Sequence, residues 1–237
     1  IIVNNISQCG DHIIRLTEET GKDLHLGLEP EPLGWFETTD ETVKFFDRLR
    51  SCKGNVYDSV IGVNYDTCHL AIEFESAADA VAALRDKNIR ISKIHLSSAL
   101  RLSPSPQSLR ILKDYEDDVY LHQVVAKTKE GTLQRYRDLS DALKYAMSGA
   151  ECDDEEWRVH FHIPLHSSPG NQFNDTRDHI EDILALLSSD PFLCQHLEME
   201  TYTWEVLPDD LQSGDVVEQL VREYQWTLER LARVSLA

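Results

Sequence analysis

Short apolar segments alternate with helical patterns along the first part of the chain, and this rhythm limits the fold more than any other feature. Residues 24–28, 60–65 and 91–96 are rich in Leu, Ile and Val, which indicates strands. Between them, residues 39–52 and 76–87 carry the capping residues and spacing of helices. Because strands that alternate with helices form parallel sheets with crossover connections, the pattern predicts an α/β fold.

The rhythm changes after residue 100. Two strand-like segments, 119–126 and 132–136, flank Lys129-Glu130-Gly131, and this pattern predicts a β-hairpin. We therefore expect an insertion with a hairpin over residues 100–157. We expect this insertion to lie inside a single domain that spans residues 1–237.

Strand-like patterns resume after the insertion, over residues 158–165 and 196–201. Five strands with crossover helices fit a piece of a (β/α)8 barrel or an open doubly wound sheet. Neither a GxGxxG nor a GxxxxGK[ST] loop is present, so the nucleotide-binding form of the open sheet lacks its usual marker. Further helices are expected over residues 5–20, 140–147, 176–187 and 216–234.

The excess of acidic over basic residues disfavours anionic partners. The chain has 23 Lys and Arg against 42 Asp and Glu, which gives a formal net charge of −19. Such a charge disfavours nucleic acid and anionic membranes as partners, and no apolar run is long enough to span a bilayer. The 5 cysteines are scattered without a CxxC motif, so we expect free thiols in the cytoplasm. A small-molecule enzyme or an acidic partner-binding domain fits best.

Carboxylate and imidazole side chains stand where each predicted strand ends. Singly they have ordinary explanations: Asp66 could cap a helix, His95 could be a core histidine, and Cys68 could pack. The carboxyl ends of parallel strands meet at one edge, so the set favours a site for Mn²⁺, Mg²⁺, Zn²⁺, Co²⁺ or Fe²⁺. The residues are Glu29 and Glu31, Asp66 and His69, His95, His160 and His162, and Glu198 and Glu200.

This order of residues resembles the xylose isomerase-like TIM-barrel superfamily, which includes sugar isomerases, ketose 3-epimerases and endonuclease IV. The resemblance implies that the metal ligands are Glu29, Asp66, His95 and Glu200. It also implies substrate contacts from His69 and Glu37, with Glu31 beside them. Glu200 is preferred over Glu198 because Met199-Glu200-Thr201 resembles the last strand end of the superfamily.

Longer sequence segments resemble the EboE-type metabolite traffic proteins of that superfamily. They include Leu28-Glu29-Pro30-Glu31-Pro32, Tyr65-Asp66-Thr67-Cys68-His69 and the segment 197–204. The resemblance implies an incomplete TIM barrel, because the four ligand-bearing strands match only the last four βα units. We therefore expect the C-terminal part of a longer barrel, and its unpaired sheet edges would favour an oligomer.

The resemblance implies a divalent-metal-dependent isomerase or epimerase that acts on a sugar or cyclitol, or on its phosphate. The reaction would pass through a metal-stabilised enediolate, with Glu29 and Glu200 as base and acid. A second reading is an endonuclease IV-like phosphoester hydrolase, in which His69, His160 and His162 hold a second metal. A third is a scaffold that binds or carries a metabolite without transforming it.

Overall fold

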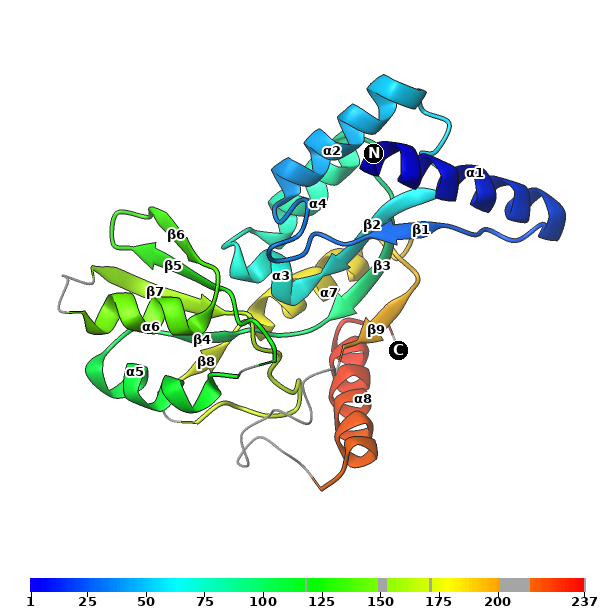
Figure 1. Cartoon of the computed structure of the whole chain (residues 1–237). Helices are drawn as coiled ribbons and strands as arrows, with labels where there is room; N and C mark the ends of the chain where they lie inside the picture. Colours follow the sequence, from blue (N-terminus) through cyan, green and yellow to red (C-terminus); the bar gives the residue numbers. More distant parts are fainter. Residues whose placement is uncertain (118, 149–152, 171, 201–213, 237) are drawn as a thin grey trace.

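The computed structural model of this chain contains two β-sheets with helices around them (Figure 1). It describes every residue except 118, 149–152, 171, 201–213 and 237. One sheet has four parallel strands, and the other has five antiparallel strands. The α/β class that the sequence predicts is therefore confirmed.

The parallel sheet has the strand order β1-β2-β3-β9. Its register places Asp66 beside His95 and His95 beside Glu198, so that residues far apart in the sequence share one edge. The predicted strands at these four places are confirmed, with ends that differ by a few residues; Thr201 lies outside the described part. Their bounds are β1 Leu26–Leu28, β2 Ile61–Asp66, β3 Ile91–Leu96 and β9 Leu197–Met199.

Five helices pack side by side against one face of this sheet. Each contacts the next in the order α1, α2, α4, α7, α8. Side chains alternate along a strand, so Ile61, Val63 and Tyr65 of β2 join the helix-covered core, and Asn64 and Asp66 occupy the other face. The helices are α1 Ile2–Thr20, α2 Thr39–Lys53, α4 Ala77–Asp86, α7 Arg177–Ser189 and α8 Val216–Arg233; a short α3, Thr67–Ile72, follows β2.

The antiparallel sheet has its own core and the order β6-β5-β7-β4-β8. The predicted hairpin is confirmed as β5 and β6, and the sheet takes in β8 beyond the expected insertion. Trp157 is fully buried in this second core. The strands are β4 Leu100–Leu102, β5 Val124–Thr128, β6 Leu133–Tyr136, β7 Asp154–Val159 and β8 Asn174–Asp175; the helices are α5 Pro106–Leu112, η1 Lys113–Tyr115 and α6 Leu139–Met147.

The predicted main-sheet strand over 158–165 is wrong. The strand in this region is β7, and it pairs antiparallel with β4 and β5. The following residues cross between the sheets: the His160 amide donates to Gln123 O, and the Ile163 amide donates to Ser98 O just after β3. Pro164 has no amide hydrogen, so this segment cannot continue a ladder. His160 and His162 therefore lie on a connection between the sheets.

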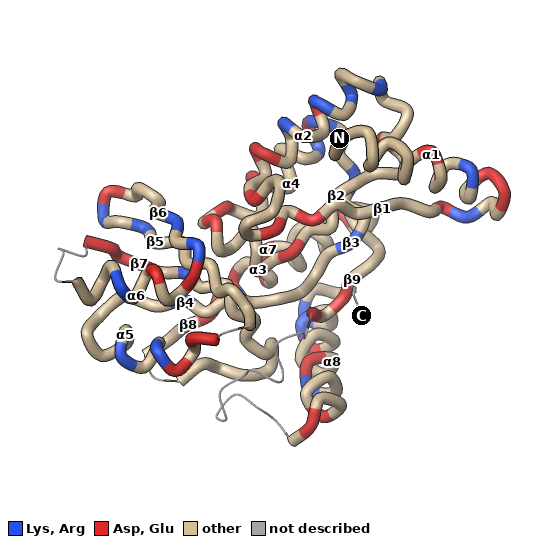
Figure 2. Tube along the Cα trace, in the orientation of Figure 1, with Lys and Arg blue, Asp and Glu red and all other residues tan. Residues whose placement is uncertain are grey.

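Charged residues are spread over both parts of the molecule. Figure 2 shows Asp and Glu along the helices of the parallel sheet and along the strands of the antiparallel sheet. Among the described residues, no helix is both long and apolar enough to cross a membrane.

Candidate metal centre

The four predicted metal ligands meet at the C-terminal edge of the parallel sheet. Glu29 follows β1, Asp66 ends β2, His95 lies in β3, and Glu200 follows β9. Each of the four offers a ligand atom, and these atoms lie within 4.8 Å of one another. The parallel order of the strands brings the residues together, because each strand ends at the same edge of the sheet.

Asp66 is held rigidly, and one of its oxygens is left over. Its Oδ1 accepts hydrogen bonds from the His69 amide at 2.9 Å and from Ser97 Oγ at 2.6 Å. Asp66 is thus the N-cap of α3 as well as a member of the cluster. Its Oδ2 and the Oε2 of Glu200 are buried and receive no hydrogen bond. Both oxygens face His95 Nδ1, at 3.5 and 3.4 Å, so either this imidazole when protonated or a bound cation can balance their charge.

Asn64 orients another ligand, and the sequence interpretation missed it. Its Nδ2 donates to Glu29 Oε2 at 2.7 Å. The other oxygen of Glu29, Oε1, lies 3.2 Å from His95 Nδ1. Asn64 stands two residues before Asp66, so the alternation of side chains along β2 could have placed it on the ligand face.

The cluster carries an electrostatic imbalance. Burial alone would lower the pKa of His95, but the carboxylates of Asp66, Glu200 and Glu29 raise it to about 11. Burial raises the pKa of the Glu200 carboxyl to about 7. Three carboxylates around one imidazole therefore need positive charge, which a proton or a divalent cation can supply. Oxygen and imidazole donors without a thiolate suit a hard or borderline divalent ion.

Glu198 lies outside this four-residue cluster. Its carboxylate is half-exposed and accepts from Lys93 Nζ at 2.7 Å. The Oε2 atom of Glu198 is 3.7 Å from His95 Nε2, on the far side of the imidazole from the other carboxylates. The structure therefore brings Glu200 into the cluster rather than Glu198.

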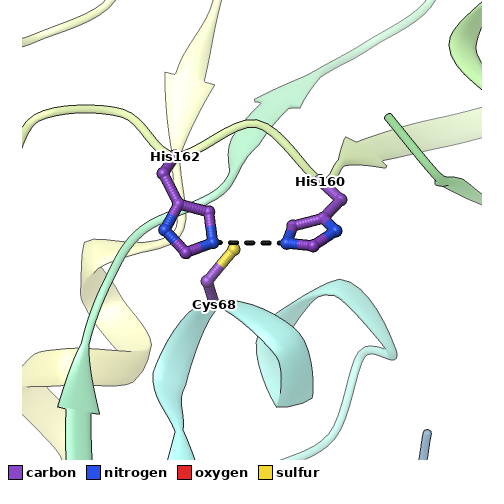
Figure 3. A group of neighbouring side chains, drawn as sticks. All are labelled: Cys68, His160 and His162. Carbon is purple, nitrogen blue, oxygen red and sulfur yellow. Dashed lines mark hydrogen bonds between the residues drawn. The ribbon is translucent and has the colours of Figure 1, made fainter. Parts of the chain in front are cut away.

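A second set of buried donors adjoins the first. Figure 3 shows Cys68, His160 and His162 facing one another, with the two Nε2 atoms of the imidazoles 3.2 Å apart. Burial lowers the pKa of His162 to about 4 and the pKa of His160 well below its ordinary value. Neutral imidazoles are the form that binds metals.

The three residues predicted for a second metal do not form one group. His160 and His162 group with Cys68, His69 and His160 group with Glu31, and His69 and His162 group with Asp66 and Glu200. The thiol of Cys68, expected only to pack, is the donor that sequence reasoning missed. Burial raises the pKa of this thiol, so it is protonated in the absence of a metal.

A cavity of about 450 Å³ opens beside the cluster. The predicted contact residues His69 and Glu31 line it, and His69 is held by the hydrogen bond that its Nδ1 donates to Pro30 O at 3.0 Å. Glu37 is not among the lining residues; it accepts a hydrogen bond from Gln123 Nε2 at 2.7 Å. The lining residues are Glu31, Pro32, Leu33, His69, Tyr120, Leu121, Gln123, His160 and Glu200.

The four-residue cluster, the adjoining donors and the cavity together form one candidate site at the end of the parallel sheet. The antiparallel sheet closes one side of it, since Gln123 immediately precedes β5 and His160 immediately follows β7. No protein-family model, no curated protein and no solved structure matches this chain.

Proposed function

We propose that this chain belongs to a divalent-metal-dependent isomerase or epimerase that acts on a sugar or a cyclitol. The observation that carries the proposal is the cluster of Glu29, Asp66, His95 and Glu200, with ligand atoms within 4.8 Å of one another. Two buried carboxylate oxygens without hydrogen bonds support it, as does the cavity beside them. The resemblance of this order of residues to that of the xylose isomerase-like superfamily supports the class of reaction.

The proposal extends to the fold. The order β1-β2-β3-β9 follows the chain, each strand is parallel to its neighbour, and the helices form one continuous row outside them. Four successive βα units of a (β/α)8 barrel would have this arrangement, with their ligands at the C-terminal ends of the strands. We propose that the sheet is the last half of such a barrel and that the antiparallel sheet is an insertion.

The residues of the cluster and the cavity would have different roles in the proposed reaction. Asp66 and His95 would hold the metal, which when bound would polarise a substrate carbonyl and favour negative charge on its oxygen. Glu29 and Glu200 are close to the cation site, so that one would take a proton from the substrate carbon and the other would return it. Glu200 suits this task because it lines the cavity as well as belonging to the four-residue cluster. His69 lines the cavity and would contact a substrate oxygen.

Metal content tests this proposal. The protein would be purified without chelator and analysed by inductively coupled plasma mass spectrometry, beside the double variant Asp66→Ala/His95→Ala. We expect about one divalent ion per chain in the wild type and none in the double variant, because the variant lacks two of four ligands. Glu198→Gln is the matched control, since Glu198 lies next to the cluster but pairs with Lys93. An absence of metal in the wild type, even after reconstitution, would contradict the proposal.

The additional donors favour one alternative, a multi-metal hydrolase of small phosphoesters. Cys68, His160 and His162 are buried and could hold a second ion, as could the group of Glu31, His69 and His160. Two or three ions per chain, reduced by His160→Ala, would support this alternative. One ion per chain in both the wild type and His160→Ala would support the isomerase.

A further inference from the structure

The cavity beside the cluster is rich in acceptors, and among its described lining residues the imidazoles of His69 and His160 are the only side chains that could carry a positive charge. Its nine lining residues include the carboxylates of Glu31 and Glu200 but neither Lys nor Arg. Every Lys and Arg of the chain belongs to the described part, because residues 118, 149–152, 171, 201–213 and 237 include none. Phosphate sites in proteins depend on such cations or on free backbone amides.

Two backbone amides at the helix start nearest the cluster are already bonded to side chains of the protein. The helix that begins nearest the cluster is α3, and its first amides are already bonded. The Cys68 amide donates to Ser97 Oγ at 3.0 Å, and the His69 amide donates to Asp66 Oδ1 at 2.9 Å. This helix end is therefore occupied by side chains of the protein.

Gln123 lines the cavity and carries an acceptor without a hydrogen bond. The side chain is 2% exposed, and its Nε2 donates to Glu37 Oε2 at 2.7 Å. A carboxylate only accepts hydrogen bonds, so this contact fixes the amide with its nitrogen toward Glu37. The Oε1 atom is then left buried without a hydrogen bond in a residue that lines the cavity. A ligand that satisfies Oε1 has to offer a hydrogen-bond donor.

A bound divalent metal would not give the three carboxylates of the cluster a net positive charge. The carboxylates of Glu29, Asp66 and Glu200 carry three negative charges when ionised, which exceed the two positive charges of the ion. Glu31 adds a further carboxylate at the cavity wall. In contrast, Leu33 and Leu121 give the cavity an apolar rim that suits the C–H face of a sugar or cyclitol ring.

From this balance we infer that the substrate is an uncharged polyol, without a phosphate group, and that Gln123 accepts one of its hydroxyl hydrogens. This inference rests on the proposed function, because it names the substrate class of the same site. It makes Gln123 a substrate-binding residue and leaves the four metal ligands unchanged.

Calorimetric titration of the Mn²⁺-loaded chain tests the inference with two matched pairs: D-fructose against D-fructose 1-phosphate, and myo-inositol against myo-inositol 1-phosphate. We expect at least one parent polyol to bind, and its phosphate ester to bind at least about tenfold more weakly because of like-charge repulsion. The variant Leu121→Lys places a cation at the half-exposed rim. This variant should reduce the ratio of the two dissociation constants, phosphate ester to parent polyol, several-fold without a change in metal content.

Gln123→Met should weaken the binding of the parent polyol about fivefold or more, because the substitution removes the acceptor but conserves the side-chain volume. Circular dichroism and metal content would confirm that the variant is folded and loaded. A phosphate ester that binds as tightly as its parent, or the absence of binding by either parent, overturns the inference. Loss of the metal centre is a different result: it is read from metal content and would count against the proposed function. Binding of a polyol without its isomerisation would also leave the inference standing and refute the proposed reaction.

Discussion

Asp66 uses its two carboxylate oxygens differently. The Oδ1 atom caps α3 through the His69 amide and also accepts from Ser97, and Oδ2 remains without a hydrogen bond in the cluster. A ligand whose first oxygen is fixed by the protein can present its second oxygen in one orientation, which lowers the cost of binding a cation. The helix cap and the metal ligand are therefore compatible explanations of the same residue.

His179 is a buried histidine whose charge state bears on stability. Its Nε2 lies 2.9 Å from the Tyr65 hydroxyl, and burial lowers its pKa to about 4 from an ordinary value of 6.5. Because the folded pKa is lowered, the unfolded chain binds more protons between these pH values. The free energy of unfolding should therefore fall as the pH drops from 6.5 to 4, by up to roughly 3 kcal/mol from this residue.

Urea denaturation at a series of pH values would measure this effect. The variant His179→Gln keeps a side chain that can hydrogen-bond but cannot titrate, so its stability should depend less on pH over this interval. His12→Gln, at an exposed position on α1, is the matched control and should follow the wild type. Parallel curves for His179→Gln and the wild type would show that His179 does not titrate in this way.

At the scale of elements, the close approach of β2 and β3 depends on Gly62. A Cβ atom at this position would press on the carbonyl oxygen of Arg90 and on Ser92 Oγ. The β2–β3 register shifts next to it, between Val63 and Asn64. Gly62→Ala should therefore lower the free energy of unfolding by about 1–3 kcal/mol, the usual cost of overpacking.

Chemical denaturation would measure the Gly62→Ala change. Gly170→Ala is the control, because a Cβ at Gly170 has no described neighbour within 4 Å, and we expect a change below about 0.5 kcal/mol there. Equal stability of the two variants would argue against the tight contact between β2 and β3.

The strand ends were predictable from the sequence, but the connection between the sheets was not. Glu29, Asp66, His95 and Glu200 each terminate an apolar strand in a βα rhythm, so their meeting follows from parallel topology. The segment after β7 has alternating apolar residues like a strand, yet its hydrogen bonds go to Gln123 and Ser98 in different parts of the fold. Periodicity gives no information on which neighbour a backbone will bond. The same limit explains why the role of Gln123 appeared only in the structure.

At the scale of the whole molecule, the site connects distant parts of the chain. Its four proposed metal ligands span residues 29 to 200, and its cavity is completed by residues that flank the antiparallel sheet. The two sheets have separate hydrophobic cores. A ligand bound at the junction of the two sheets would contact residues next to both. Its binding should therefore require both parts to be folded.

Metal binding should therefore stabilise the whole fold. A divalent ion that binds only the folded chain, at about 100 times its dissociation constant, would add about 2.7 kcal/mol to the free energy of unfolding. For a chain of this size each kcal/mol raises the midpoint by about 2–4 °C, so we expect an increase of roughly 5–10 °C in Tm. Differential scanning calorimetry of the EDTA-treated protein with and without Mn²⁺ would measure it. Glu198→Gln should retain the increase, and Asp66→Ala/His95→Ala should lose it. An equal increase in the double variant would mean that the ion binds elsewhere on this acidic chain, and that the four strand ends do not hold it.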